Sequence, residues 1–311
     1  MSIKYLQDVL DSGQFTSADM NGGKYVQKLE RTIRDFTGAK YCVVVNSGTS
    51  ALYASLLALN IDDYARGVHP SFTFKATRNV IDAVNGIPYG IDVRKEDMTL
   101  DPNDMEWSNK SIKYHYMIPV HLYGHIADMP ALKEKGIPII EDCCQALGSR
   151  LNGKHVGLFG DVGCFSFYPS KIINGGEGGC VITNNKRIAD KLKVLRNHGK
   201  GKQWGLNLRM SEIHAAIAFG NMEKINKILE TRKKNAKILS EIFKDETQYY
   251  PRKGEHRNNQ LFTITVKNRK KFMEKYPQSR IYYDYTLGYG ENSEWLSKHC
   301  VSFATDKVGI K

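Results

Sequence analysis

Short apolar runs alternate with helical stretches through the first two thirds of the chain. The run "YCVVV" at 41–45 is β-branched and therefore strand-like, and "SGTSALYASLLAL" at 47–59 begins a helix with residues that cap helix ends. Further buried strands are expected at 116–124, 137–142, 165–168 and 180–183. This alternation predicts an α/β layer architecture.

The last third has a different pattern. From Ser211 a helix begins, with a kink expected at Gly220–Asn221, and it resumes through 222–243, which is unusually long for a globular helix. Beyond it, 259–266 and 280–285 are expected to be strands. We therefore expect a large domain over 1–225 and a smaller domain over 226–311 that is entered by the long helix.

The composition of the chain excludes several classes of protein. The chain is 41% hydrophobic and 25% charged, which sets disordered and fibrous proteins aside. No apolar run approaches the ~20 residues that span a bilayer, and the first residues lack the profile of a secretory signal. A cytoplasmic location is expected, with the six cysteines reduced because their spacing matches no paired metal site.

The net charge of +12 is unevenly distributed. Residues 186–275 carry 23 Lys and Arg against 9 Asp and Glu, a net of +14 that leaves −2 for the rest of the chain. Such a region attracts nucleic acid, an acidic membrane surface or a phosphorylated small molecule, although a solvated helix face explains "TRKKNAK" at 231–237 equally well. Because no nucleic-acid-binding motif is present, nucleic acid is kept only as a side activity.

Three polar features follow strand-like runs, at the edge where open α/β sheets bind ligands. The first is "NSGTSAL", in which Gly48 and Thr49 open a helix after a strand. The free N–H groups and positive dipole of such a turn bind anions, and glycine lets a phosphate approach closely. Taken alone, simple helix capping explains the motif.

The second feature is "IPIIEDCCQALGS". Asp142 closes an apolar strand, and a buried carboxylate there is costly unless a cation meets it. It would suit a protonated ring nitrogen, and Gln145 could donate to a nearby ring oxygen. The alternative is that Asp142 is the N-cap of a helix and needs no ligand.

The third feature is Lys171, which lies between a strand and a glycine-rich turn in "FSFYPSKIINGGEGGCVITN". An amine in a sheltered pocket can form a Schiff base with a carbonyl compound, whereas most lysines are simply exposed in loops. Pyridoxal 5'-phosphate is bound through its phosphate, its ring nitrogen and its aldehyde. The three features together offer a phosphate site, an acid for the protonated ring nitrogen and an amine for the aldehyde.

The chain resembles the fold-type I aminotransferases of the DegT/DnrJ/EryC1/StrS family, which act on nucleotide-linked keto-sugars. The matching motifs occur in the family's order between about residues 11 and 240: "SGTSAL", "HPSFTFKAT", "PVHLYGHIADM", "IIEDCCQALGS", "FSFYPSKIINGGEGGCVITN", "RNHG" and "GLNLRMSEIHAAI". The resemblance implies a three-layer large domain with a mixed, mostly parallel sheet and a smaller, shortened C-terminal α+β domain.

The resemblance also implies roles for individual residues. Lys171 would be the Schiff-base lysine and proton carrier, Asp142 would pair with the pyridine nitrogen, and Gln145 would approach the ring hydroxyl. The remaining cofactor contacts would be Gly48, Thr49 and Ser166 to the phosphate, Phe74 on the ring face, and Asn207 to the phosphate of the neighbouring subunit of a homodimer.

The implied reaction is a ping-pong transfer. An amino donor, expected to be glutamate, would load the cofactor, and a 4-keto or 3-keto nucleotide sugar would then accept the amine, as in amino sugar biosynthesis. The basic stretch offers the substrate's diphosphate an electrostatic partner, for which Lys200, Lys202 and Arg209 are the expected residues. No membrane partner is expected.

Departures from the family pattern leave alternatives open. Members of the family have more residues before "SGQFTS" and continue further after "CVSFATDK", so a shortened small domain that binds cofactor or a partner without transaminating is one alternative. A sugar dehydratase of the same family is another, although it would carry histidine at position 171. His121 and His125 have an i, i+4 spacing, but Gly124 and a strand-like run argue against a metal site, and none is expected.

Overall fold

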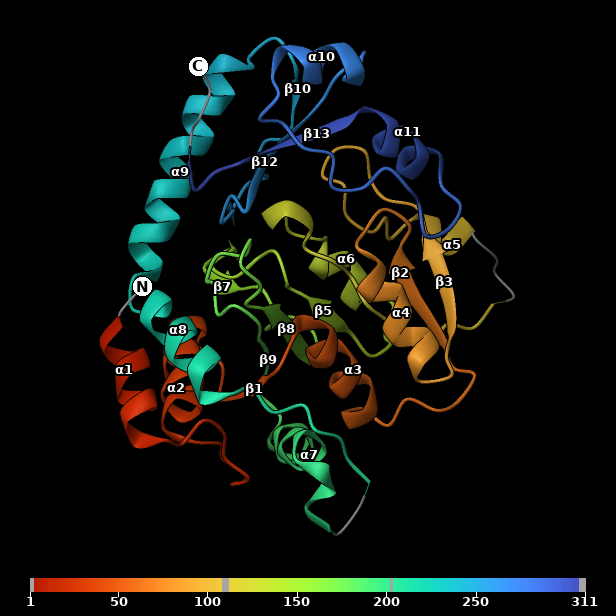
Figure 1. Cartoon of the computed structure of the whole chain (residues 1–311). Helices are drawn as coiled ribbons and strands as arrows, with labels where there is room; N and C mark the ends of the chain where they lie inside the picture. Colours follow the sequence, from red (N-terminus) through yellow and green to blue (C-terminus); the bar gives the residue numbers. More distant parts are fainter. Residues whose placement is uncertain (1–2, 108–111, 202–203, 308–311) are drawn as a thin grey trace.

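The structure is a computed structural model that describes residues 3–107, 112–201 and 204–307. Figure 1 shows a central sheet with helices around it and a C-terminal group of strands and helices beyond one edge. No helix among the described residues is long and apolar enough to cross a membrane.

The central sheet is built from two hydrogen-bonded groups of strands. One has the order β1 (Tyr41–Val45), β9 (Gly179–Thr183), β8 (Val162–Ser166) and β5 (Ile140–Asp142), and the other has the order β3 (Ile87–Ile91), β2 (Arg66–Pro70) and β4 (Tyr116–Met117). Parallel bridges from Met117 to Ile139 and from Val120 to Asp142 join the β4 side to β5. Only the β9 pairings are antiparallel, which confirms the mixed, mostly parallel sheet.

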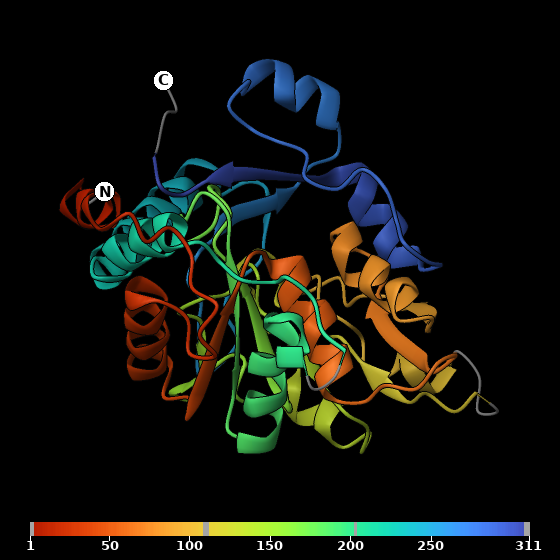
Figure 2. The ribbon, with the colours of Figure 1, turned by 60° about the horizontal axis from the view of Figure 1, so that its bottom comes forward.

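Side-chain alternation along β1 explains the three layers. Cys42 and Val44 belong to a buried cluster shared with helices α2 (Lys24–Thr37) and α8 (Glu212–Met222). Val43 and Val45 face the other way, into a cluster with α3 (Gly48–Ala58) and α7 (Lys186–Arg196). Figure 2 shows α3 and α7 together on one face of the sheet.

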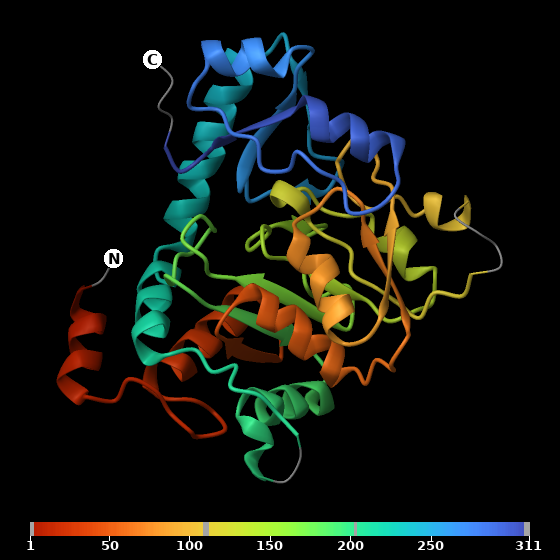
Figure 3. The same cartoon turned by 45° about the vertical axis from the view of Figure 1, so that its right-hand side comes forward.

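The C-terminal group is organised around an antiparallel sheet. Its strand order is β10 (Thr247–Gln248), β12 (Leu261–Thr265) and β13 (Cys300–Ala304), and the long helix α9 (Ile225–Ile242) leads into it. Figure 3 shows this group above one end of the central sheet. The remaining elements are α1 (Ile3–Ser12), α4 (Lys75–Ala83), α5 (Asp104–Trp107), α6 (Met129–Lys133), α10 (Arg269–Lys275), α11 (Glu291–His299), two 3-10 turns (Leu122–Gly124 and His198–Gly201), and a small sheet of β11 (Glu255–His256), β6 (Arg150–Leu151) and β7 (Lys154–His155).

Three expectations about secondary structure were wrong in detail. The helix break lies between Met222 and Ile225, and Gly220 is buried inside α8. The strand expected at 116–124 stops at Met117; Pro119 offers no N–H, and the chain then turns into a 3-10 helix. The stretch 280–285 forms one isolated bridge instead of a strand, since Tyr283 and Tyr285 pack into a cluster of buried side chains.

Candidate active site

Three strands end at the same edge of the sheet. Strands β1 and β8 are both antiparallel to β9 and so run in the same direction, and β5 is parallel to β8. Their carboxyl ends open onto a cavity of about 310 Å³. Its lining residues are Ser47, Gly48, Thr49, Leu52, Thr73, Phe74, Ala76, Val120, Asp142, Cys144, Gln145, Ser166, Tyr168, Ser170, Lys171, Glu177, Tyr282 and Tyr283.

The N-terminus of α3 forms one wall of this cofactor cavity. The Ser47 hydroxyl caps the helix by accepting a hydrogen bond from the N–H of Ser50 at 3.0 Å. The N–H groups of Gly48 and Thr49, in the first turn, have no intrahelical acceptor. A side chain at position 48 would place its Cβ 2.8 Å from both Cys144 Sγ and Ser166 Cβ, so only glycine fits. The result is a wall that can bind an anion.

Asp142 is buried at the end of β5, with 5% of its surface exposed. Its Oδ1 accepts the N–H of Cys144 at 3.1 Å, and its Oδ2 accepts the hydroxyl of Thr77 at 2.9 Å. No helix begins at Asp142, so the N-cap alternative is wrong. A carboxylate can accept about four hydrogen bonds, which leaves capacity for a donor in the cavity.

Gln145 connects the cavity wall to the C-terminal third of the chain. Its Oε1 accepts the N–H of Tyr123 at 3.0 Å, and its Nε2 donates to the hydroxyl of Tyr283 at 2.8 Å. The Tyr283 ring stacks on Tyr123, with 5.8 Å between ring centroids. Burial raises the pKa of the Tyr283 phenol. Because an amide nitrogen carries two hydrogens, one N–H of Gln145 remains for a ligand.

Lys171 lies in the turn after β8 and lines the cavity, half-buried. Its N–H donates to the carbonyl of Tyr168 at 2.9 Å, and the carbonyl of Ser170 accepts a hydrogen bond from Gln260 at 2.6 Å. Strand β8 ends at Ser166, two residues earlier than predicted, so Tyr168 is exposed. The turn that carries the amine is thus held partly by the C-terminal third of the chain.

The thiol of Cys144 shares this wall. Burial first, and then the nearby Asp142 charge, raise its pKa well above the ordinary value. We therefore expect a protonated, unreactive thiol between Gly48 and Asp142. All six cysteines are free, as the sequence predicts for reduced thiols.

Phe74 and Ser166 complete the set of expected residues found at the cavity. Phe74 lies at the start of α4 and is 55% exposed, at the mouth of the cavity. The Ser166 hydroxyl accepts the N–H of Tyr168 at 3.3 Å.

Three other expected residues are described by the structure and do not line this cavity. Asn207 is exposed, Lys200 donates to the carbonyl of Ala18, and Arg209 donates to the side chain of Asn197. Lys202 lies outside the described residues.

Sequence reasoning missed Thr77, Glu177, Tyr282 and Tyr283. Thr77 follows Phe74 by three residues on the first turn of α4, and that spacing was a usable signal. No local signal could place the two tyrosines, which come from a stretch predicted to be a strand.

The expectation that His121 and His125 bind no metal remains a prediction, and the contacts of His121 are in line with it. His121 Nε2 lies 3.0 Å from Glu141, and its Nδ1 accepts the N–H of Ala127. His121, Glu141 and Cys143 approach one another closely enough to be considered as ligands. Glu141, however, already accepts three backbone N–H groups besides His121, which leaves it no free lone pair.

Comparison with known proteins supplies independent information. The model of the DegT/DnrJ/EryC1/StrS aminotransferase family matches residues 1–286. The chain is 34% identical to GDP-perosamine synthase from Vibrio cholerae, over 83% of this chain and 71% of that protein. It is 39% identical to a UDP-N-acetyl-3-dehydro-alpha-D-glucosamine 3-aminotransferase from Acidithiobacillus ferrooxidans, over 63% of this chain and 55% of that protein. The crystal structure of S. venezuelae DesV in complex with a ketimine intermediate superposes with a TM-score of 0.90 at 26% identity, over 97% of this chain and 88% of that one.

Proposed function

Because this chain belongs to the DegT/DnrJ/EryC1/StrS aminotransferase family, we propose that it transfers an amino group from glutamate to a keto-sugar linked to a nucleotide. Its enzyme class is that of a pyridoxal-phosphate-dependent sugar aminotransferase. The observation that carries the proposal is that Lys171, Asp142 and the N-terminus of α3 line one cavity, although they are far apart in the sequence.

The residues present fit the cofactor. The free N–H groups of Gly48 and Thr49, with the Thr49 and Ser166 hydroxyls, would hold the phosphate. Asp142 has unused acceptor capacity for the pyridine N–H. Gln145 would donate its second N–H to the ring hydroxyl, while its first remains on the phenol of Tyr283.

When bound, pyridoxal 5'-phosphate supplies an electron sink for the charge left by a departing α-proton. Asp142 would keep the ring nitrogen charged, because a carboxylate stabilises a cationic partner in a site shielded from water. Lys171 would hold the cofactor through its Nζ, and the same amine would be the base that accepts and returns a proton. Phe74 would cover one ring face at the cavity mouth.

A second copy of the chain would complete the site. Asn207 is exposed and does not line the cavity of its own chain, which supports a contact with the neighbouring subunit's phosphate in a homodimer. Lys200 and Arg209 lie near it in the sequence and are also absent from the cavity lining. We assign both, with Lys202, to the diphosphate of the sugar nucleotide bound at that shared site.

The half-reactions test this proposal separately. The purified protein saturated with cofactor should be yellow, and glutamate should shift its absorption to that of the amine form. The amine form is then titrated with keto-sugar nucleotides that differ in nucleotide and in ring carbon, and one of them should restore the original spectrum. A coloured protein that responds to no amino donor would contradict transamination. It would favour the alternative of a protein that binds the cofactor or a partner without transaminating.

Charge-neutralised variants test the substrate contact. Replacing Lys200, Lys202 and Arg209 together by alanine should weaken the binding of the sugar nucleotide. The glutamate half-reaction should be unchanged. Equal sugar-nucleotide affinity in the triple variant and the wild type would remove these residues from the proposal.

A further inference from the structure

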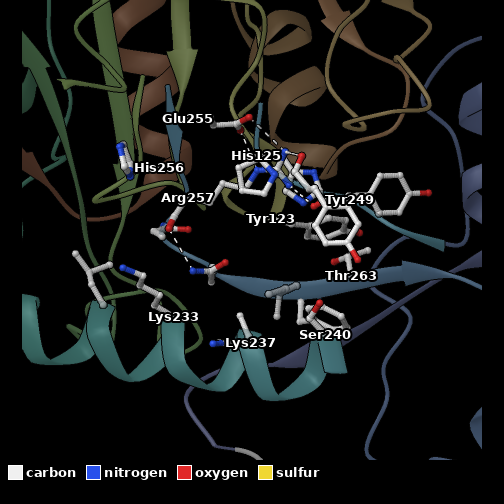
Figure 4. A pocket seen from close by; sticks show the side chains of 18 of the residues that line it. Tyr123, His125, Lys233, Lys237, Ser240, Tyr249, Glu255, His256, Arg257 and Thr263 are labelled. Atoms are coloured by element: carbon white, nitrogen blue, oxygen red, sulfur yellow. Dashed lines mark hydrogen bonds and ion pairs between the residues drawn. The ribbon is translucent and has the colours of Figure 1, made fainter. Parts of the chain in front are cut away.

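A second cavity of about 490 Å³ lies between helix α9 and the segment 248–259, with strand β12 contributing to its lining. Figure 4 shows His125, Tyr249, Glu255 and Arg257 grouped on one side of it and Lys233, Lys237 and Ser240 along α9 on the other. The size is in the range of small-molecule sites. None of the expected cofactor or substrate residues that the structure describes lines it.

The two cavities share a wall but remain separate. Tyr123 lines the second cavity, whereas Gln145 and Tyr283 line the cofactor cavity. The N–H of Tyr123 donates to Gln145, and the Tyr123 ring stacks on Tyr283. These contacts close the space between the cavities.

His125 presents an unused acceptor to the second cavity. Its ring is 4% exposed, and its Nδ1 lies 2.9 Å from the carbonyl oxygen of Asp97, so Nδ1 carries the proton and donates. Burial and the nearby Arg257 charge lower the pKa of His125 to about 3, so the ring is neutral at ordinary pH. Among the described residues Nε2 has no hydrogen-bond partner, and it is not sealed off from the cavity. The site therefore offers a fixed lone pair to a donor.

The charge available in the cavity comes from α9. Lys233 and Lys237 are one turn apart, and neither ammonium has an ion-pair partner among the described residues. Arg257 differs, because it is paired with Glu255 and donates to the carbonyls of Tyr249 and Tyr250. Among the described lining residues the exposed carboxylate of Glu230 is the one other charge, so the α9 side has a net charge of +1.

Aromatic rings complete the lining. Tyr249 lies beside His125, with 6.0 Å between ring centroids, and its hydroxyl is bonded to Thr265 at 3.1 Å. Tyr250 is 67% exposed. Flat rings of this kind stack on heterocyclic bases.

From these observations we propose that the second cavity binds a nucleoside monophosphate. Its phosphate would lie on Lys233 and Lys237, its base against the tyrosines, and an N–H of the base would donate to Nε2 of His125. The inference goes beyond the transferase reaction and does not depend on it, because none of these residues belongs to the cofactor cavity.

Calorimetric titration of the cofactor-saturated protein with AMP, CMP, GMP and UMP tests the proposal. At least one nucleotide should bind saturably and more tightly than inorganic phosphate. The variant K233A/K237A should bind it about tenfold more weakly, since two exposed charge contacts contribute up to about 0.7 kcal/mol each. The matched control K227A/K234A removes two lysines of the same helix that do not line the cavity and should stay within about twofold of wild type.

The variants also separate this site from the catalytic one, where the nucleotide of the substrate would bind. Nucleotide binding that is equally tight in K233A/K237A and in wild type would belong elsewhere and would overturn the proposal. Equal losses in both double variants would show unspecific attraction to a basic helix and would overturn it too, as would the absence of saturable binding. The glutamate half-reaction should be unchanged in both variants, so a failure here is distinguishable from a failure of the proposed function.

Discussion

Glu141 and Asp142 stand side by side at the end of β5, and alternation along the strand turns their side chains to opposite faces. Glu141 has four hydrogen-bond donors, which are His121 and the N–H groups of Gly157, Phe159 and Gly160. Asp142 has two, from Cys144 and Thr77, and it faces the cofactor cavity. A carboxylate whose acceptor sites are all filled by the protein holds a loop, whereas one with sites left open can bind a ligand.

The largest expected effect is on the Asp142 side. D142A should weaken pyridoxal phosphate binding by about 10²–10⁴-fold, because removing one partner of a buried charge pair costs about 3–5 kcal/mol. Fluorescence titration of the cofactor-free protein measures this affinity, and D142N separates loss of charge from loss of shape. Cofactor affinity equal to wild type in D142A would contradict the assignment of Asp142.

Glu141 should give the opposite pattern. E141A leaves three backbone N–H groups and His121 without their acceptor. The N–H of Gly157 and the ring of His121 are buried, and each unsatisfied buried group costs about 1–3 kcal/mol, so the free energy of unfolding should fall by about 2–6 kcal/mol. Urea denaturation of the cofactor-free protein measures it. A free energy of unfolding equal to that of wild type in E141A would contradict the structural role of Glu141. An equal loss of stability in cofactor-free D142A and E141A would contradict the difference between the two carboxylates.

Low pH should also lower the stability of the folded protein, through His155 near the loop that Glu141 holds. Burial lowers the pKa of His155 to about 3, and its neighbour Val156 adjoins the loop that Glu141 holds. As the pH falls below the unfolded value of about 6.5, the unfolded state takes up a proton that the folded state refuses, so stability falls by about 1.4 kcal/mol per pH unit. Urea denaturation at pH 5, 6 and 7 gives the slope of the free energy of unfolding against pH. In H155Q this slope should be smaller by the contribution of one proton, about 1.4 kcal/mol per pH unit. An identical slope in variant and wild type would exclude His155 as its source.

The smallest expected effect concerns Thr77. T77V removes the hydroxyl that donates to Asp142. It should lower the affinity for the cofactor about fivefold, since such a hydrogen bond contributes about 1 kcal/mol. Thr73→Val is the comparison, because Thr73 lines the same cavity and lies 3.4 Å from the Thr77 hydroxyl but has no hydrogen bond to Asp142, so its effect should be smaller. Equal effects of the two substitutions would mean that Thr77 does not position the carboxylate.

Local pattern was sufficient for much of the fold. Strand β1 and helix α3 begin and end within a residue of their predicted bounds, because the capping serine Ser47 comes only two residues after the end of a β-branched run. Lys171, Asp142 and Gly48 were found for a similar reason: each lies at or shortly after the end of a buried strand, and strands that run in the same direction bring their carboxyl ends together.

What the sequence could not predict depends on distant pairs. Thr77 meets Asp142 across 65 residues, and Gln145 meets Tyr283 across 138. The stretch around Tyr283 has a strand-like local composition, but burial of Tyr283 against Phe72 and Tyr123 decides its conformation. The saturation of Glu141 is likewise invisible locally, because its donors come from a loop 16 to 19 residues further along.

The most direct test of the account is to reduce the cofactor-saturated protein with borohydride, digest it and map the labelled peptide. The account predicts a single pyridoxyl label, on Lys171, and none in protein reduced without cofactor. A label on another lysine, or an unlabelled Lys171 at full cofactor saturation, would contradict it.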